Sequence, residues 1–193
     1  VGSNAMDVNS TGASNTSVGY AALNANTTAD SNTAVGRSAL ALNTTGTGNT
    51  SVGSYSLDAN TTANDNTAMG QSALGQNTTG ASNTAIGRSA LTVNTTGAYN
   101  TAIGAASLAA HTTGVRNDAL GYQAGTAVTT GGYNTFIGER AGASTTTASE
   151  NVAVGSASLN ANTTGTANIA IGKNALTANT TASNNTALGF KAL

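Results

Sequence analysis

Side chains that could act as acids, bases, nucleophiles or metal ligands are few in this sequence and lie far apart. The 193 residues include six Lys and Arg, seven Asp and Glu, one His and no Cys. Catalysis needs titratable groups that converge on one reacting atom, and this set offers no nucleophile with a base beside it. We therefore expect neither an enzyme nor a protein that holds a cofactor.

Metal, nucleic acid and membrane binding are also disfavoured by composition. Asp30, Asp58 and Asp65 match neither an EF-hand nor a calcium-binding nonapeptide spacing. The net charge of −1 and the 7% of charged residues leave no basic patch for nucleic acid or for an anionic membrane surface. No apolar run is long enough to span a bilayer. We expect no metal site, no nucleic-acid partner and no membrane insertion.

A strict internal repeat is the dominant feature of the chain. Gly recurs every 17 residues from Gly2 to Gly189 without insertion or deletion, within the consensus N-T-A-[IV]-G-x-x-A-L-x-x-N-T-T-G-x-x. A unit of this size cannot bury a core alone, so each unit must stack on its neighbours. The repeat predicts a solenoid.

The coils of this solenoid are expected to be β-structure. No repeat contains an uninterrupted helical segment of ten residues, whereas short runs of Thr, Val and Ile between Asn, Gly and Ser are typical of strands joined by tight corners. The sequence thus predicts an all-β fold, a parallel β-solenoid with one 17-residue coil per repeat. It forms a single domain over residues 1–193, with about eleven coils and a length of roughly 50 Å.

An unbroken column of Asn is expected to form a structural ladder. Stacked Asn side chains can hydrogen-bond to one another and to the backbone, and Asn tolerates the conformations of tight corners. The ladder residues are Asn15, Asn32, Asn49, Asn66, Asn83, Asn100, Asn117, Asn134, Asn151, Asn168 and Asn185.

Each repeat also has more apolar surface than one coil can bury. In the strand segment Ala34 and Val35 point to opposite faces, and the same adjacency recurs in pairs such as Ala39 and Leu40. We expect small residues to fill the lumen while Val, Ile and Leu pack against neighbouring chains, or the reverse. Both assignments predict an oligomer, because a monomer would leave a continuous apolar stripe in water.

Residues 105–150 depart from the consensus and gather charged and aromatic side chains. Such exceptions on a rigid scaffold can recognise a cell-surface receptor or glycan. The interpretation we favour is a change of coil shape, in which Phe136 fills space where the Leu position becomes Gly125 and Gly142. His111 occupies a position that is usually Asn, so we expect it to replace a corner residue. The candidate recognition residues are His111, Arg116, Asp118, Tyr122, Tyr133, Glu139 and Arg140.

Ice binding by the Thr columns and glycosylation of the Asn residues are both disfavoured by the geometry of the repeat. A flat array of Thr could bind ice, but neighbouring residues such as Thr95 and Thr96 point to opposite faces of an extended chain. The N-x-T triplets, for example at Asn77 and Asn94, could carry glycans. Glycans on successive coils would be only about 4.8 Å apart, too close for branched sugars.

The repeat resembles known fibre proteins. The segment Asn83–Leu91, N-T-A-I-G-R-S-A-L, followed by N-T-T-G at Asn94–Gly97, resembles repeats of tail-fibre-domain proteins of phages and bacteria. The element A-[IV]-G-x-x-A is similar to head repeats of trimeric autotransporter adhesins, which are parallel β-rolls assembled as trimers. The resemblance covers essentially the whole chain and implies a homotrimer, although the period of 17 is longer than that of the adhesin heads.

We therefore expect a structural or adhesive fibre segment, a rigid rod displayed outside the cell on a virion or cell surface. One alternative is a self-assembling extracellular filament, because few Lys and Glu guard the open strand edges of the end coils. The alternative from another class is a solenoid that binds ice or carbohydrate.

Overall fold

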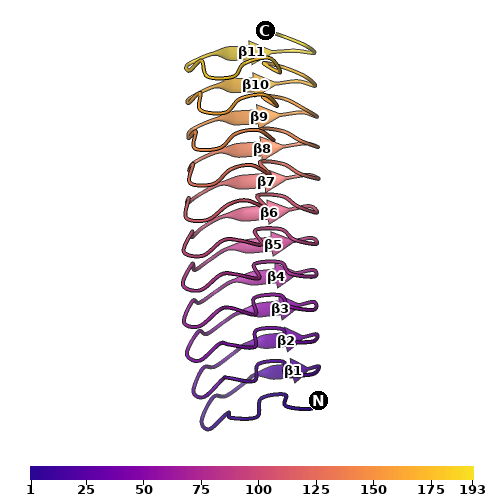
Figure 1. Cartoon of the computed structure of the whole chain (residues 1–193), viewed down its shortest axis with the longest axis vertical. Coiled ribbons are helices and arrows are strands. Elements are labelled where there is room, and N and C mark those ends of the chain that lie inside the picture. Colours follow the sequence, from indigo (N-terminus) through magenta and orange to yellow (C-terminus); the bar gives the residue numbers. More distant parts are fainter.

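The computed structural model describes residues 1–193 and shows a β-solenoid with one coil for each 17-residue repeat (Figure 1). Eleven short strands form one parallel sheet in chain order, and each pairs with the next without any shift of register. Turns and bends complete each coil, and no helix is long and apolar enough to cross a bilayer. The strands are β1 (Thr16–Val18), β2 (Thr33–Val35), β3 (Thr50–Val52), β4 (Thr67–Met69), β5 (Thr84–Ile86), β6 (Thr101–Ile103), β7 (Asp118–Leu120), β8 (Thr135–Ile137), β9 (Val152–Val154), β10 (Ile169–Ile171) and β11 (Thr186–Leu188).

The Gly that follows each strand is required by the close approach of successive coils. Gly87 has a φ of +132°, a conformation that side chains disfavour. A Cβ atom on Gly87 would lie 2.6 Å from the carbonyl carbon of Gly104 in the next coil. Because the same crowding recurs along the rod, this column of the repeat has no exceptions.

The middle residue of each strand faces the lumen, and the last residue faces outward. Ala85 in β5 is fully buried, whereas Ile86 beside it is 36% exposed. For the strands, the side-chain directions of the first expected arrangement are therefore confirmed. Small residues line the lumen, and Val and Ile lie on the outer face.

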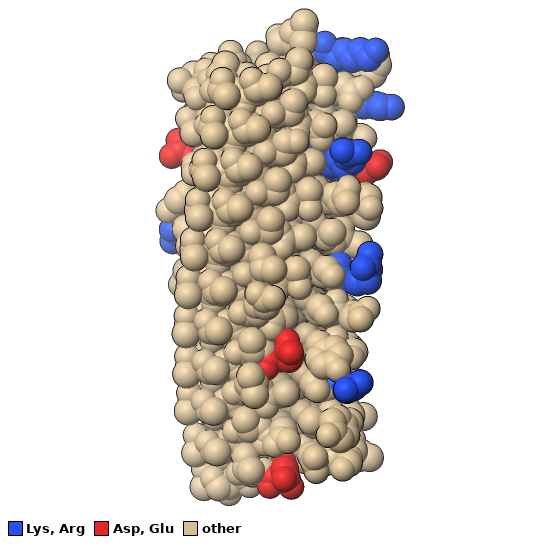
Figure 2. All heavy atoms as spheres, viewed as in Figure 1, with Lys and Arg blue, Asp and Glu red and all other residues tan.

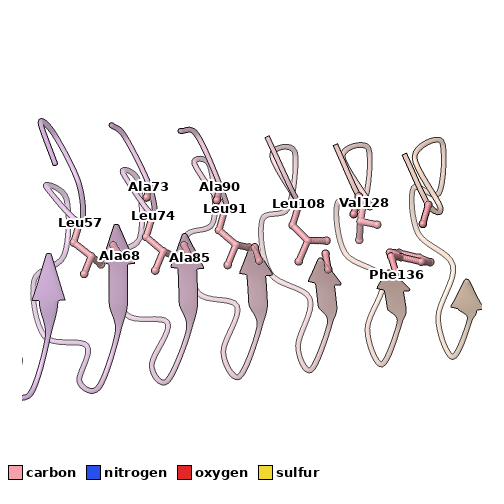
Figure 3. Packing of buried hydrophobic residues seen from close by; sticks show 14 of the residues in the cluster. Leu57, Ala68, Ala73, Leu74, Ala85, Ala90, Leu91, Leu108, Val128 and Phe136 are labelled. Carbon is pink, nitrogen blue, oxygen red and sulfur yellow. The ribbon is translucent and has the colours of Figure 1, made fainter. Parts of the chain in front are cut away.

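The Leu position does not follow that arrangement, and its expected packing against other chains is wrong. Ala90 and Leu91 are adjacent, yet both are fully buried in the lumen. Leu91 has a φ of +50°, so the side-chain alternation of an extended strand does not apply here. Figure 3 shows the Leu side chains in one file beside the Ala residues of the strands. The buried members of the Leu column are Leu23, Leu40, Leu57, Leu74, Leu91, Leu108, Leu159 and Leu176.

The Asn column lies at the start of each strand as a ladder that is buried along most of the rod. The backbone N–H of Asn83 donates to Oδ1 of Asn66 at 2.9 Å, and its side-chain Nδ2 donates to the carbonyl of Gly97 at 2.8 Å. Each amide therefore links three successive coils. A second ladder runs through the N-T-T-G corner, where Nδ2 of Asn94 donates to Oδ1 of Asn77 and to the carbonyl of Gly97.

The departure from consensus at residues 105–150 leaves strand pairing unchanged, since β7, β8 and β9 stay in register. Phe136 in β8 points into the lumen and is fully buried. Cβ atoms on Gly125 and Gly142 would lie within 3 Å of its ring. The ring thus fills the space of the two missing Leu side chains (Figure 3).

Candidate functional site

The outer face of the sheet carries a continuous row of aliphatic side chains, here called the outer stripe. Unshifted pairing places each member directly above the one before it, as with Met69 and Ile86. These side chains are only partly covered, with Met69 42% and Leu120 45% exposed. The outer stripe comprises Val18, Val35, Val52, Met69, Ile86, Ile103, Leu120, Ile137, Val154, Ile171 and Leu188.

The first residue of most strands shares this face with the stripe. It is Thr in β1 to β6, and Thr84 and Thr101 are half-buried with their side chains outward. The face is therefore a band of methyl groups with hydroxyls along one side. It runs the length of the rod, roughly 50 Å for eleven strands, far longer than the apolar patches of most monomers.

Basic residues gather along one side of this face, in the two positions that follow the Gly after each strand. Five of the six Lys and Arg residues lie there, and all are exposed. Figure 2 shows most Lys and Arg atoms along a single edge of the rod. The only acidic residue in these two positions is Glu139. This basic edge comprises Arg37, Arg88, Arg140, Lys173 and Lys191.

The opposite side of the face, just before the ladder Asn, is acidic. Asp30, Asp65 and Glu150 are exposed there, and the only basic residue is Arg116. We call Asp30, Asp65 and Glu150 the acidic edge. The strand face is therefore an apolar band bordered by opposite charges.

Arg116 lies between two tyrosines from the coils on either side. Its guanidinium carbon is 5.4 Å from the ring centre of Tyr99 and 5.5 Å from that of Tyr133, and Nη1 donates to the Tyr133 hydroxyl at 2.8 Å. These distances are typical of cation–π contacts. Tyr99 was not among the sequence-predicted residues, although it stands one period before Arg116 and two before Tyr133.

The other predicted recognition residues do not join this stack. Asp118 opens β7 on the strand face, while Tyr122, Glu139 and Arg140 lie past the far ends of their strands. All four are exposed. The structure thus divides the predicted patch between the two sides of the strand face.

His111 is fully buried and cannot contact a receptor, so its place among the recognition residues was wrong. Its Nδ1 is 3.1 Å from Oδ1 of Asn94, and its Nε2 is 3.2 Å from Nδ2 of Asn117. The amide oxygen of Asn94 must accept and the amide nitrogen of Asn117 must donate, which fits a neutral ring protonated at Nδ1. Burial lowers the pKa of His111 to about 4. The residue joins the two Asn ladders, as expected for a corner residue.

The paired Thr residues form a corner and not a flat array. Thr96 is exposed, whereas Thr95 is half-buried and its hydroxyl donates to the Thr112 carbonyl at 3.2 Å. Nδ2 of Asn94 closes the turn around them by its bond to the Gly97 carbonyl. A single file of exposed Thr therefore runs along this corner.

The surface has no pocket, and no three His, Asp or Glu side chains gather in the manner of a metal site. The largest continuous feature that could engage another molecule is therefore the strand face with its two charged edges. It suits docking of a long, flat partner.

No protein-family model, curated protein or solved structure matches this chain.

Proposed function

We propose that the protein is a rod-shaped structural segment that assembles with copies of itself along its strand face. The observation that carries this proposal is the outer stripe, partly exposed in every coil along the rod. Burial of apolar area contributes about 25 cal/mol per Å², so a stripe of this length strongly favours association. The hydrogen-bonded coils supply the stiffness that a fibre segment needs.

Display outside the cell, on a virion or cell surface, is proposed from the resemblance of the repeats to fibre and adhesin sequences. A trimer is the assembly that this resemblance favours. Within an adhesive fibre, the exposed rings of Tyr99 and Tyr133 that flank Arg116 are the best candidate for contact with a receptor or glycan. Aromatic and Arg side chains often dominate such contacts.

The experiment compares two matched double variants by size-exclusion chromatography with light scattering. Ile86→Ser with Leu120→Ser removes two members of the outer stripe, and we expect it to shift the protein towards monomer. Leu42→Ser with Val93→Ser removes two aliphatic side chains that lie outside the strands, and we expect the assembly to persist. Equal masses for the two variants would contradict a role for the stripe.

The same measurement addresses the alternatives. Very large, open-ended species would favour an extracellular filament. A stable monomer would favour a single solenoid that binds ice or carbohydrate, for which the band of Thr and aliphatic side chains on the strand face is the candidate surface. Inhibition of ice recrystallisation by that monomer would then be the next measurement.

A further inference from the structure

The charges that border the strand face select one way in which two copies can meet. Each strand runs from the acidic edge to the basic edge, because Asp65 stands two residues before β4 and Arg37 two residues after β2. All eleven strands point in the same direction. The face therefore has a fixed polarity across the rod.

That polarity distinguishes parallel from antiparallel rods. When copies surround an axis parallel to the rods with their strand faces inward, the basic edge of one copy meets the acidic edge of the next. When two rods pack face to face in opposite directions, the basic edge of one lies on the basic edge of the other. Like charges across an interface oppose association.

We propose that the strand face docks a second copy of this chain with the two rods parallel and in register, so that basic and acidic edges pair between copies. This inference rests on the proposed self-assembly and adds its orientation and its contacts. It applies to a dimer as well as to a trimer, because neighbours around any such axis meet in the same way. Closed symmetry about this axis also allows no axial shift.

Heights along the rod support the pairing. One coil of 17 residues climbs about 4.8 Å. Arg37 and Asp30 are seven residues apart in sequence, and Arg140 and Glu150 are ten apart, so each pair differs by only about 2–3 Å in height. In register, Arg37 therefore lies opposite Asp30 and Arg140 opposite Glu150 on the next copy.

The two exceptions to the edge charges also match each other. Glu139 is the only acid on the basic edge, and Arg116 is the only base on the acidic edge. They are 23 residues apart, or about 6–7 Å in height, within reach of two long side chains. In the parallel arrangement, Glu139 of one copy therefore lies near Arg116 of the next.

The available area suits a specific interface. Five residues across the face, at about 3.3 Å each, and eleven strands at about 4.8 Å give roughly 800 Å² per copy. Two copies would bury about 1,600 Å², the usual size of a stable protein interface. Its centre would be apolar and its rim charged, as in most such interfaces.

Cysteine cross-linking tests the orientation, and the chain has no Cys of its own. Parallel rods in register bring residue 30 of one copy beside residue 37 of the next. We expect Asp30→Cys with Arg37→Cys to form a disulfide between chains under mild oxidation. Within one chain these positions lie at opposite ends of a strand, roughly 16 Å apart, too far for a disulfide.

The matched control is Arg37→Cys with Ser156→Cys, which pairs two positions of the basic edge that antiparallel rods would bring together. We expect no cross-link between chains in this variant. Cross-linking of the control and not of the test variant would overturn the proposal in favour of antiparallel rods. If neither variant cross-links but light scattering shows an oligomer, the parallel, in-register arrangement is overturned, although self-assembly itself stands. A monomer would overturn both proposals.

Charge reversal gives an independent readout. Arg140→Glu alone places two acidic side chains opposite each other, one at position 140 and Glu150 of the next copy. We expect the association to weaken several-fold. Adding Glu150→Arg in the same chain restores opposite charges, and the association should recover. No recovery in the double variant would contradict the pairing of these edges.

Discussion

The repeat is constrained residue by residue through backbone conformation. In nearly every coil the residue at the Leu position has a positive φ although it is not Gly, as Leu91 shows. A second non-glycine residue with positive φ stands just before the ladder Asn in most coils, as Tyr99 shows. Such conformations cost about 1–2 kcal/mol each. They turn successive side chains inward at the Leu position and outward at Tyr99, so they decide which residues the rod presents to a partner.

The Gly after each strand should be the least replaceable residue. We expect Gly87→Ala to lower the free energy of unfolding by at least about 2 kcal/mol, because its Cβ would collide with the Gly104 carbonyl. Urea unfolding measures this loss. The control is Gly75→Ala, where an added Cβ would lie no closer than 3.3 Å to any neighbour and where other coils carry Ala41 and Ala109. Equal losses would contradict the explanation.

His111 should make stability depend on pH. Its pKa is about 4 when folded against an ordinary 6.5, so between these values the unfolded chain binds a proton that the folded chain does not. Stability is therefore complete above pH 6.5 and falls as the pH drops towards 4, by up to about 3 kcal/mol.

Thermal unfolding at pH 7, 5.5 and 4.5 measures this dependence. His111→Asn restores the residue that other coils carry and provides the control. Its unfolding temperature should fall less over the same range, and an identical decline in both proteins would exclude His111 as the cause.

At the scale of the element, the 17-residue coil could be predicted from the sequence, because separate repeat positions indicate the strand, the corner and the Asn ladder. The inward direction of the Leu side chains could not be predicted. Alternation of side chains between two faces requires an extended backbone, and nothing in the residue type of Leu91 indicates its positive φ. The stack around Arg116 was found only in part. Tyr99 lies outside residues 105–150, where the departures from the consensus begin, although its repeat position is that of Tyr133.

The lumen near β8 should behave as one coupled unit. Phe136→Ala should cost about 3–5 kcal/mol, because Gly125 and Gly142 have no side chains to fill the cavity. Gly142→Leu alone should also destabilise, since the ring of Phe136 occupies the space.

Combining Phe136→Ala with Gly125→Leu and Gly142→Leu rebuilds the consensus lumen, and we expect most of the lost stability to return. The free energy of unfolding of each variant, measured by chemical denaturation, completes a mutant cycle for these three residues. Additive losses in the combined variant would show that these residues do not share one space.

For the whole molecule, the decisive property is that each coil contacts its neighbours in the same way. Pairing joins only successive strands, so stability and stiffness grow coil by coil. Each coil also adds one aliphatic side chain to the outer stripe, so the apolar area available for association increases with the length of the rod. With few charges elsewhere, the two edges of the strand face dominate its electrostatics.

The mass of the intact protein in solution tests this account most directly. Native mass spectrometry and light scattering should give a small whole-number multiple of the 18.6 kDa chain mass, three being the number that the resemblance favours. The multiple should stay constant on moderate dilution. A monodisperse species of 18.6 kDa at all concentrations would contradict the central claim that the outer stripe is an interface between copies.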